Sequence, residues 1–320
     1  MQVYQYIVII ALAVMASSVF TSIEIPILKH RQFQQFIREE GPKSHLKKEG
    51  TPTMGGIAIY AAIVLVSMIG MSLTRDMGVL LIFGALYGLI GFADDFIKVT
   101  QKHNLGLRAW QKLILQIVLG LGFGYYVVKF TNLGTNVWVP FIDKDVDFGM
   151  WFIPFVAFVI VAVANSVNLT DGLDGLCAGV TAIFAFGFAL IADGFSAFPS
   201  GVYCLAIVGS CIGFMFFNKF PAQVFMGDTG SMALGGGLAA AVILTKAELM
   251  IPFVGLVFVV EALSVIIQVI GFKTTGKRLF RMAPIHHHFE LGGMKETSVV
   301  KMFWVFAAIC CVAGLLIMKI

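Results

Sequence analysis

The sequence predicts an all-α polytopic membrane protein of about ten transmembrane helices, organised as one integral membrane domain over residues 1–320. Of the 320 residues, 59% are hydrophobic and only 12% are charged, and the mean hydropathy is +0.92. Soluble domains carry about 25% charged residues, so this composition excludes a soluble globular fold. The apolar residues also fall into ten runs, and each approaches the length of about 20 residues that a helix needs to cross a bilayer.

The ten runs are 3–23, 55–73, 77–93, 112–128, 151–167, 175–192, 201–217, 230–245, 249–272 and 302–318. The first has no basic segment ahead of it, which favours a retained helix over a cleaved signal peptide. The eighth is short and rich in glycine. Between the fourth and fifth runs, Asn132 to Asp147 are rich in turn formers and β-branched residues, so we expect a small hairpin on the outer side.

Charge distribution predicts the orientation. Ten crossings place both termini on one side, and most of the 22 Lys and Arg residues fall in the loops on the other side. Short cytoplasmic loops are enriched in Lys and Arg, so both termini are expected outside. The loops 24–54, 94–111, 168–174, 218–229 and 273–301 are then cytoplasmic. They carry nearly every cluster of chemically capable residues, so we expect them to form the active site.

Two adjacent carboxylates close the third run. Asp94 and Asp95 follow a long apolar stretch, and Lys98 comes one helical turn later. Carboxylates at such a position are costly unless a cation or a water-filled cleft receives them. Magnesium typically takes one or two carboxylates together with phosphate oxygens of a substrate. The alternative is an acidic cap at the membrane interface.

A second polar cluster lies between the fifth and sixth runs. Asn165, Asn168, Asp171 and Asp174 recur at every third position, so on a helix or a tight helical turn they share a broad face. Glycines within the cluster allow a ligand to approach the backbone closely. Packing alone does not readily explain four such side chains on one face.

A third cluster opens the eighth run. Asp228 is expected in an exposed, flexible turn between two glycines, where its carboxylate can reach a metal. The N–H groups of the following helix favour anions such as phosphate. Phe225 fits either the core or stacking on a flat ring, and the residues alone favour the core. Asn218 fits either a base edge or a loop cap.

Three consecutive histidines, His286, His287 and His288, lie in the last cytoplasmic loop. Consecutive side chains point in different directions, which argues against one shared zinc site. Their basic neighbours favour phosphate contact instead. A fifth segment, Lys48 to Gly56, adds glycines and hydroxyls that suit an anion site. Together the five clusters supply what metal-assisted phosphoryl transfer requires.

These motifs resemble one family. GFADDFIK, NLTDGLDGL, FMGDTGS, APIHHHFE and KKEGTPTMGG are similar to segments of the bacterial phospho-N-acetylmuramoyl-pentapeptide transferases. That family belongs to the polyprenyl-phosphate N-acetylhexosamine-1-phosphate transferase superfamily. The Asp-rich motifs are shared across the superfamily, whereas GTPTMGG and APIHHHFE point to the muramoyl-pentapeptide branch. The resemblance runs essentially from end to end.

The resemblance implies a reaction of peptidoglycan synthesis. UDP-MurNAc-pentapeptide and undecaprenyl phosphate would give undecaprenyl-pyrophosphoryl-MurNAc-pentapeptide (lipid I) and UMP, with Mg²⁺ as cofactor. It further implies a multi-pass protein of the bacterial cell membrane with a cytoplasmic active site, surrounded by membrane lipids. A homodimer is expected, and no nucleic-acid partner.

The resemblance also implies roles for individual residues. The catalytic residues would be Asp94, Asp95, Asp228, His286 and His287. Asp228 would bind magnesium, and the two histidines would serve the pyrophosphate or its transition state. Phe225 would stack on uracil, against its interpretation as core. Substrate contacts are implied for Lys48, Thr53, Lys98, Lys112, Asn168, Asp171, Asp174, Asn218, Phe225 and His288.

Several alternatives stay open from the sequence. Single displacement by the lipid phosphate is favoured over a phospho-enzyme on a carboxylate, because a phosphate monoester is mostly a dianion at neutral pH. Transfer of N-acetylglucosamine-1-phosphate is the nearest rival activity. An ion-coupled transporter is a rival of another class, and it would place carboxylates near the bilayer midplane. Glu261 and Gln268, inside the ninth run, fit either a transporter or interhelical hydrogen bonding.

Overall fold

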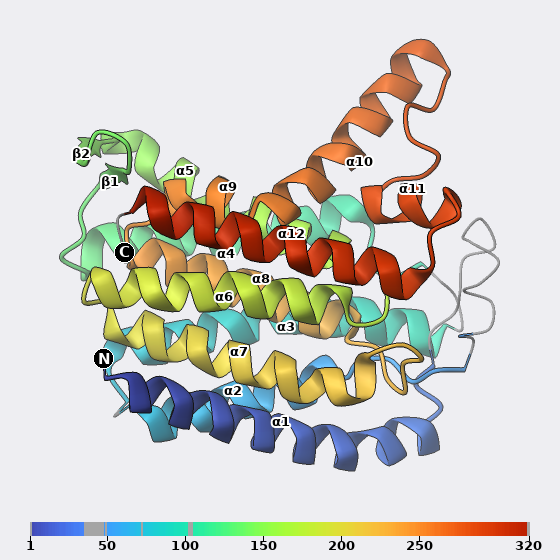
Figure 1. Ribbon diagram of the computed structural model, residues 1–320. Helices are drawn as coiled ribbons and strands as arrows, with labels where there is room; N and C mark the ends of the chain where they lie inside the picture. Colours follow the sequence, from blue (N-terminus) through green and yellow to red (C-terminus); the bar gives the residue numbers. More distant parts are fainter. Residues whose placement is uncertain (1, 35–47, 49, 72, 102–104, 319–320) are drawn as a thin grey trace.

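The computed structural model describes residues 2–34, 48, 50–71, 73–101 and 105–318, and these form a bundle of long helices (Figure 1). The helices that match the ten apolar runs are α1 (Val3–His30), α2 (Gly56–Gly70), α3 (Arg75–Thr100), α4 (Ala109–Phe130), α5 (Phe152–Thr170), α6 (Leu176–Gly194), α7 (Phe198–Asn218), α8 (Gly227–Leu244), α10 (Leu256–Thr275) and α12 (Glu296–Ile317). Within the described residues, nine helices are long and apolar enough to span a membrane, and α2 is a shorter apolar helix. The predicted fold class is confirmed.

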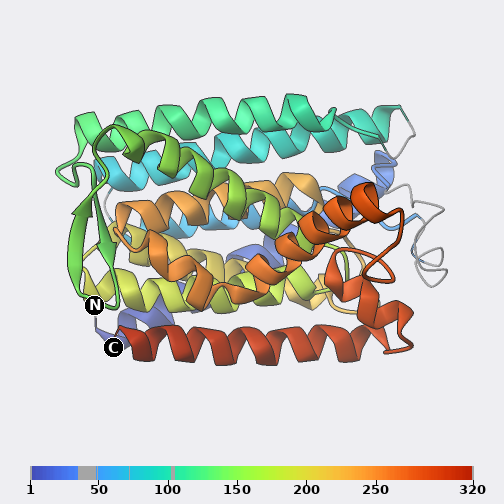
Figure 2. The same cartoon turned by 90° about the horizontal axis from the view of Figure 1, so that it is seen from above.

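The remaining elements are short. They are β1 (Asn136–Val139), β2 (Lys144–Asp147), η2 (Gly149–Trp151), η3 (Glu248–Met250), α9 (Ile251–Val254) and α11 (Ile285–Leu291). The two strands pair antiparallel with Asn136 opposite Asp147, which confirms the expected hairpin. The hairpin and both termini lie at one end of the bundle, and α11 lies at the other (Figures 1 and 2).

Some residues on which the sequence predictions rest fall outside the described residues. Part of the predicted loop 24–54 and residues 102–104 of the loop 94–111 belong to this set. Among the basic residues that predict the orientation, Arg38, Lys43, Lys47, Lys102 and Lys319 are affected. Lys48, Lys98 and Lys112, which carry predicted substrate contacts, are all described.

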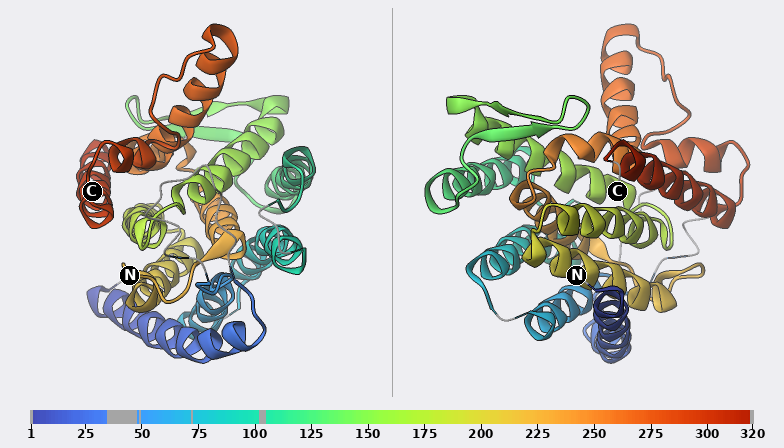
Figure 3. Two further views of the ribbon diagram at one scale, coloured as in Figure 1. Left: turned by 90° about the vertical axis from the view of Figure 1, so that its right-hand side faces the viewer. Right: turned by 60° about the vertical axis from the view of Figure 1, so that its left-hand side comes forward.

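The ninth run was predicted to be one helix, but the structure divides it into two. The chain breaks at Gly255, after the single turn of α9, and α10 then leans out of the bundle (Figure 3). A Cβ atom on Gly255 would lie 2.5 Å from the ring of Phe184, so the glycine allows α6 to pack closely at the break. A continuous apolar run contains no signal for such a break, because both halves are equally hydrophobic.

Helix α8 forms the centre of the bundle. All of its residues from Thr229 to Leu244 are buried, and α3 makes with it the largest helix–helix contact among the described elements. Glycines allow this proximity: a Cβ on Gly91 would lie 2.0 Å from the carbonyl oxygen of Asp228, and one on Gly56 would lie 2.1 Å from the Cα of Gly230. Close approach through small residues is how membrane helices gain packing energy. Gly91 of α3 and Gly56 of α2 are therefore packing features of the contacts with α8.

A buried carboxyl group at the hairpin end carries a prediction about stability. Neither oxygen of Glu248 has a hydrogen-bond partner among the described residues, and burial raises the pKa of Glu248 from 4.5 to about 8. Between those values the folded protein keeps a proton that the unfolded chain releases. The free energy of unfolding should therefore fall as the pH rises through this window. Glu248→Gln should flatten this dependence.

The measurement is the midpoint of thermal unfolding in detergent at about pH 5 and about pH 9. The wild-type protein should lose more stability between the two than Glu248→Gln does. Asp76→Asn, at an exposed position in the first turn of α3, serves as the control and should follow the wild type. Equal pH dependence in all three proteins would contradict the prediction.

Candidate active site

Three carboxylates meet at the end of the bundle opposite the termini. Asp94 and Asp95 lie in the last two turns of α3, and Asp228 lies in the first turn of α8. One oxygen from each of the three lies within 4.8 Å of the others. Residues far apart in the sequence therefore share one small volume, as the acidic motifs predicted.

Asp95 fixes the start of α8 against α3. One of its oxygens accepts a hydrogen bond from the backbone N–H of Asp228 at 3.2 Å. The other accepts from both the N–H and the hydroxyl of Thr229, each at 2.8 Å. A carboxylate at a helix N-terminus satisfies N–H groups that have no partner within the helix and opposes the helix dipole. Asp95 thus determines where the carboxylate of Asp228 stands.

Asp94 is held by the loop that follows α3. Its Oδ1 accepts from the N–H of Leu107 at 2.8 Å, and its Oδ2 lies 2.5 Å from the ammonium of Lys98. A Cβ on Gly106 would lie 2.5 Å from Asp94 Oδ1, so only glycine allows the loop to close over the carboxylate. Asp94 is 3% exposed.

Asp228 faces two lysines and an asparagine. Its Oδ2 accepts from Lys112 at 2.5 Å and from Lys98 at 3.2 Å, and its Oδ1 accepts from Asn168 at 2.8 Å. The side chain of Asp228 is 18% exposed, against 4% for Asp94, so it is the more accessible of the two carboxylates. The expected exposed, flexible turn was wrong, because α8 begins at Gly227 and includes Asp228 in its first turn.

The donor set fits a magnesium ion. Hard divalent cations prefer carboxylate oxygens, and magnesium commonly combines one or two of them with phosphate oxygens and water. Asp228, the more accessible carboxylate, and Asp94 beside it would hold the ion. Asp95 already uses both oxygens to hold α8. Lys98 lies within 4.0 Å of all three carboxylates and offsets their repulsion.

The four polar residues predicted to share one face are divided between the end of α5 and the turn after it, contrary to the prediction. Helix α5 ends at Thr170 and the chain turns through a left-handed Gly175. Within α5, Asn165 bonds to Gln116 on α4, and Asn168 bonds to Asp228 on α8. Asp174 points to a different group of residues.

That second group contains Lys48, Asp174 and Glu296. The ammonium of Lys48 lies 2.7 Å from Asp174 Oδ1 and 2.6 Å from Glu296 Oε1. The N–H of Asp174 also donates to Glu296 Oε1, at 2.9 Å. Lys48 therefore lies with Asp174 rather than with the two lysines near Asp228. Sequence reasoning missed Glu296, which belongs to none of the five clusters.

Asn218 supports the same turn from α7. Its side-chain oxygen accepts from the N–H of Gly175 at 3.0 Å, and its amide donates to the carbonyl of Val224 at 2.9 Å. The other oxygen of Asp174 accepts from the N–H of Ala222 at 2.9 Å. Asp174 and Asn218, the two residues predicted to line the nucleoside pocket, thus lie against the segment that leads into α8.

Asp171 connects the two groups electrostatically. Burial raises the pKa of Asp171 to about 8, and the negative charges of Asp228, Asp95 and Asp174 add to the effect. The group favours its protonated form near neutral pH for this reason. Any cation that enters beside Asp228 lowers that pKa again.

The segments that carry Thr53 and Phe225 run side by side. The N–H of Phe225 donates to the carbonyl of Pro52 at 2.8 Å, and its carbonyl accepts from the N–H of Gly55 at 2.9 Å. Phe225 is only half-buried, and Thr53 is buried. The pairing brings the start of α2 against the start of α8.

The three histidines have different hydrogen-bond partners, although the ring centroids of His286 and His287 lie only 4.1 Å apart. Nδ1 of His286 lies 3.1 Å from both carboxylate oxygens of Glu261, and both residues are fully buried. His287 pairs with Glu290 at 3.3 Å, and His288 accepts from the N–H of Arg281 at 3.1 Å.

Both polar residues inside the ninth run have hydrogen-bonding roles. Glu261 holds His286, whose Nε2 faces the backbone: a Cβ on Gly172 would lie 2.2 Å from it. Gln268 accepts from the N–H groups of Leu279 and Phe280 and donates to the carbonyl of Phe280. These contacts fasten α10 to the chain around α11.

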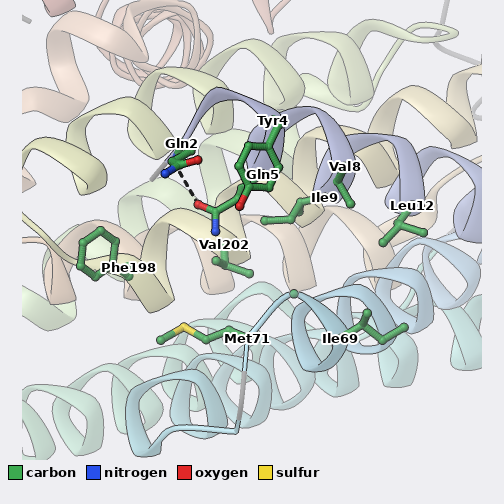
Figure 4. A pocket seen from close by; sticks show the side chains of 11 residues that line it. Gln2, Tyr4, Gln5, Val8, Ile9, Leu12, Ile69, Met71, Phe198 and Val202 are labelled. Atoms are coloured by element: carbon green, nitrogen blue, oxygen red, sulfur yellow. Dashed lines mark hydrogen bonds between the residues drawn. The ribbon is translucent and has the colours of Figure 1, made fainter.

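A separate cavity of about 680 Å³ lies at the other end of the bundle, between α1, α2 and α7. Its walls are mainly apolar, with Ile9, Ile69 and Val202 among them (Figure 4). It lies near the N-terminus, whereas the carboxylates lie at the far ends of α3 and α8. The cavity is therefore distinct from the candidate active site.

Comparisons with known proteins agree on one family. A family model described as glycosyl transferase family 4 matches residues 77–246, and a phospho-N-acetylmuramoyl-pentapeptide-transferase signature matches residues 48–59. A protein of that name from Heliobacterium modesticaldum is 50% identical over 92% of this chain and 91% of its own length. Similar proteins of the same name from Desulfitobacterium hafniense (96% of this chain, 95% of its own) and Bacillus subtilis (96% of each) are both 47% identical.

Proposed function

Because the chain belongs to the phospho-N-acetylmuramoyl-pentapeptide transferase family, we propose that it transfers phospho-MurNAc-pentapeptide from UDP-MurNAc-pentapeptide to undecaprenyl phosphate. The products are lipid I and UMP. The protein is thus a phosphoglycosyl transferase of peptidoglycan synthesis with multiple membrane spans. The observation that carries the site assignment is the meeting of Asp94, Asp95 and Asp228 beside two lysines.

The reaction joins two anions, so charge neutralisation is the main requirement. An oxygen of undecaprenyl phosphate attacks the β-phosphorus of the UDP-sugar. The bond from that phosphorus to the bridging oxygen breaks, and UMP leaves with the electron pair. Lys98 and Lys112 lie beside Asp228 and would bind the phosphate oxygens. A magnesium ion held by Asp228 and Asp94 would supply further positive charge where the two phosphates meet.

We assign the remaining residues around this centre. Asp94 would orient the attacking phosphate, which is already a dianion at neutral pH. Asp174, Asn218 and the half-buried ring of Phe225 would form the nucleoside pocket.

The histidines would act from α11: His287 on the pyrophosphate, and buried His286 through the turn at Gly172. Substrate contacts are further proposed for Lys48, Thr53, Asn168, Asp171 and His288.

The contacts of the carboxylates support a single displacement. Asp95 uses both oxygens on α8, and those of Asp228 accept from Lys98, Lys112 and Asn168. A carboxylate whose lone pairs are engaged in this way is a poor nucleophile. We therefore expect no exchange of labelled UMP into UDP-MurNAc-pentapeptide when the lipid acceptor is absent. The measurement uses stringently delipidated enzyme, and robust exchange would instead establish a phospho-enzyme.

The activity itself is tested with purified protein, magnesium and both substrates. We expect UMP release that depends on undecaprenyl phosphate and on magnesium and that chelation with EDTA abolishes. UDP-N-acetylglucosamine should give none. Release of UMP from UDP-N-acetylglucosamine but not from UDP-MurNAc-pentapeptide would instead identify transfer of N-acetylglucosamine-1-phosphate. The signature at residues 48–59 favours the muramoyl branch.

The location and assembly follow from the same proposal. We place the protein in the bacterial cell membrane with its active site cytoplasmic. The basic residues Lys98, Arg108, Lys277 and Arg278 support this, because they belong to the loops predicted to face the cytoplasm. The loops that surround the carboxylates would form the site within one membrane domain. On the family resemblance we also propose a homodimer.

A further inference from the structure

Glu296 stands at the first position of α12, and its side chain is only 8% exposed. No motif in the sequence marks it. Its neighbours Lys295 and Thr297 are exposed, so the inward direction of Glu296 distinguishes it from the rest of its turn. The helix therefore begins by placing one carboxylate against the turn between α5 and α6.

One oxygen of Glu296 serves two donors from different parts of the chain. Oε1 accepts from the ammonium of Lys48 at 2.6 Å and from the backbone N–H of Asp174 at 2.9 Å. Charge-assisted hydrogen bonds of this length are stronger than neutral ones. Three segments, the chain before α2, the turn after α5 and the start of α12, thus converge on a single atom.

Lys48 is fixed as a result. Its ammonium lies between Asp174 and Glu296, at 2.7 and 2.6 Å. The same ammonium lies 6.0 Å from the centre of the Phe220 ring. A lysine ammonium has three donor hydrogens, so one stays available for a ligand after the two carboxylates are served. A lysine that is already held in position loses less entropy when it binds that ligand.

The turn after α5 is fixed in the same way. Consecutive N–H groups, those of Asp174 and Gly175, are bonded by Glu296 and Asn218. The side chain of Asp174 is tied in turn to Lys48 and to the N–H of Ala222. The turn lies between α5 and α6 and belongs to neither helix, so these side chains help to fix its conformation.

We propose that Glu296 is a positioning residue of the nucleotide subsite, which acts through Lys48 and the backbone of Asp174 on the UDP portion of the donor. This inference rests on the proposed function, which puts Asp174 and Asn218 in the nucleoside pocket. Among the described residues, Glu296 bonds to Lys48 and Asp174 and not to Asp94, Asp95 or Asp228, so it is not assigned to the chemical step. Its loss weakens donor binding and leaves the chemical step nearly intact.

The test compares Glu296→Ala, Glu296→Gln and Glu296→Asp with Thr297→Ala, an exposed control in the same turn. For Glu296→Ala, the KM for UDP-MurNAc-pentapeptide should rise about tenfold or more, kcat should stay within about threefold, and the KM for undecaprenyl phosphate should not change. Glu296→Gln keeps an oxygen that accepts from the N–H of Asp174 but removes the negative charge that pairs with Lys48. Its effect should therefore be smaller than that of Glu296→Ala. Glu296→Asp should recover part of the loss.

Binding of UMP, measured by calorimetry, separates this inference from the proposed function because it requires no turnover. The dissociation constant for UMP should rise in Glu296→Ala and Glu296→Gln and stay unchanged in Thr297→Ala. If Glu296→Ala fails to fold, Glu296→Gln carries the test. An active wild-type enzyme with unchanged UMP binding in the folded Glu296 variants would overturn the inference alone. So would a fall in kcat at constant KM. A wild-type protein that binds UMP but makes no lipid I would overturn the proposed function alone.

Discussion

Asp228→Asn is expected to reduce lipid I synthesis by about a thousandfold, the scale at which one essential electrostatic group acts in an active site. The substitution keeps the shape of the side chain and an oxygen that accepts from Asn168. It removes the charge that Lys98 and Lys112 face and that would hold a divalent cation. The fold should survive, because Asp95 holds α8 through the backbone of residue 228 and through Thr229.

The measurement is UMP release at saturating substrate over a range of magnesium concentrations. Asp76→Asn, an exposed position in the first turn of α3, is the matched control and should keep wild-type activity. Unchanged thermal unfolding of Asp228→Asn would attribute its loss to the site. Wild-type turnover of Asp228→Asn at any magnesium concentration would contradict the assignment of this carboxylate.

Gly91→Ala is expected to damage both the fold and the site. A Cβ at this position would lie 2.0 Å from the carbonyl oxygen and 2.4 Å from the carbonyl carbon of Asp228. Backbone cannot move aside as a side chain can, so α3 and α8 would have to separate. Overpacking typically costs about 1–3 kcal/mol or more. The separation would also break the hydrogen bonds from α8 to Asp95, so activity should be nearly lost.

Gly78→Ala in the same helix is the matched control. A Cβ there meets no atom within 4 Å, and alanine favours a helix over glycine by up to about 1 kcal/mol. This variant should unfold at the same temperature as the wild type or at a higher one, with full activity. Similar thermal unfolding midpoints for Gly91→Ala and Gly78→Ala would show that the contact between α3 and α8 is looser than described.

Hydropathy predicted the fold because it reports a requirement that each span meets by itself. A run such as 201–217 must satisfy its backbone hydrogen bonds within its own helix when it crosses the hydrocarbon, whatever its neighbours are. It did not predict the break at Gly255, since the decisive contact is with Phe184 on another helix. The start of α8 was misplaced for a similar reason: Asp95, far away in the sequence, supplies the helix cap.

In the candidate site too, local sequence patterns predicted some features, and tertiary contacts decided the rest. The types of residue in the motifs indicated phosphoryl transfer before any geometry was known. Their partners followed from tertiary structure: Lys48 pairs with Asp174 because α5 ends at Thr170 and the turn after it changes direction. Glu296 was missed, because a single glutamate at the start of a helix is also an ordinary N-terminal charge.

We propose that α3 and α8 together hold one divalent cation that the transfer requires. Crystals grown with manganese in place of magnesium would test it most directly, because anomalous scattering locates the ion. We expect a peak at bonding distance, about 2.1 Å, from a carboxylate oxygen of Asp228. An active manganese enzyme whose ion lies away from Asp94 and Asp228 would contradict it.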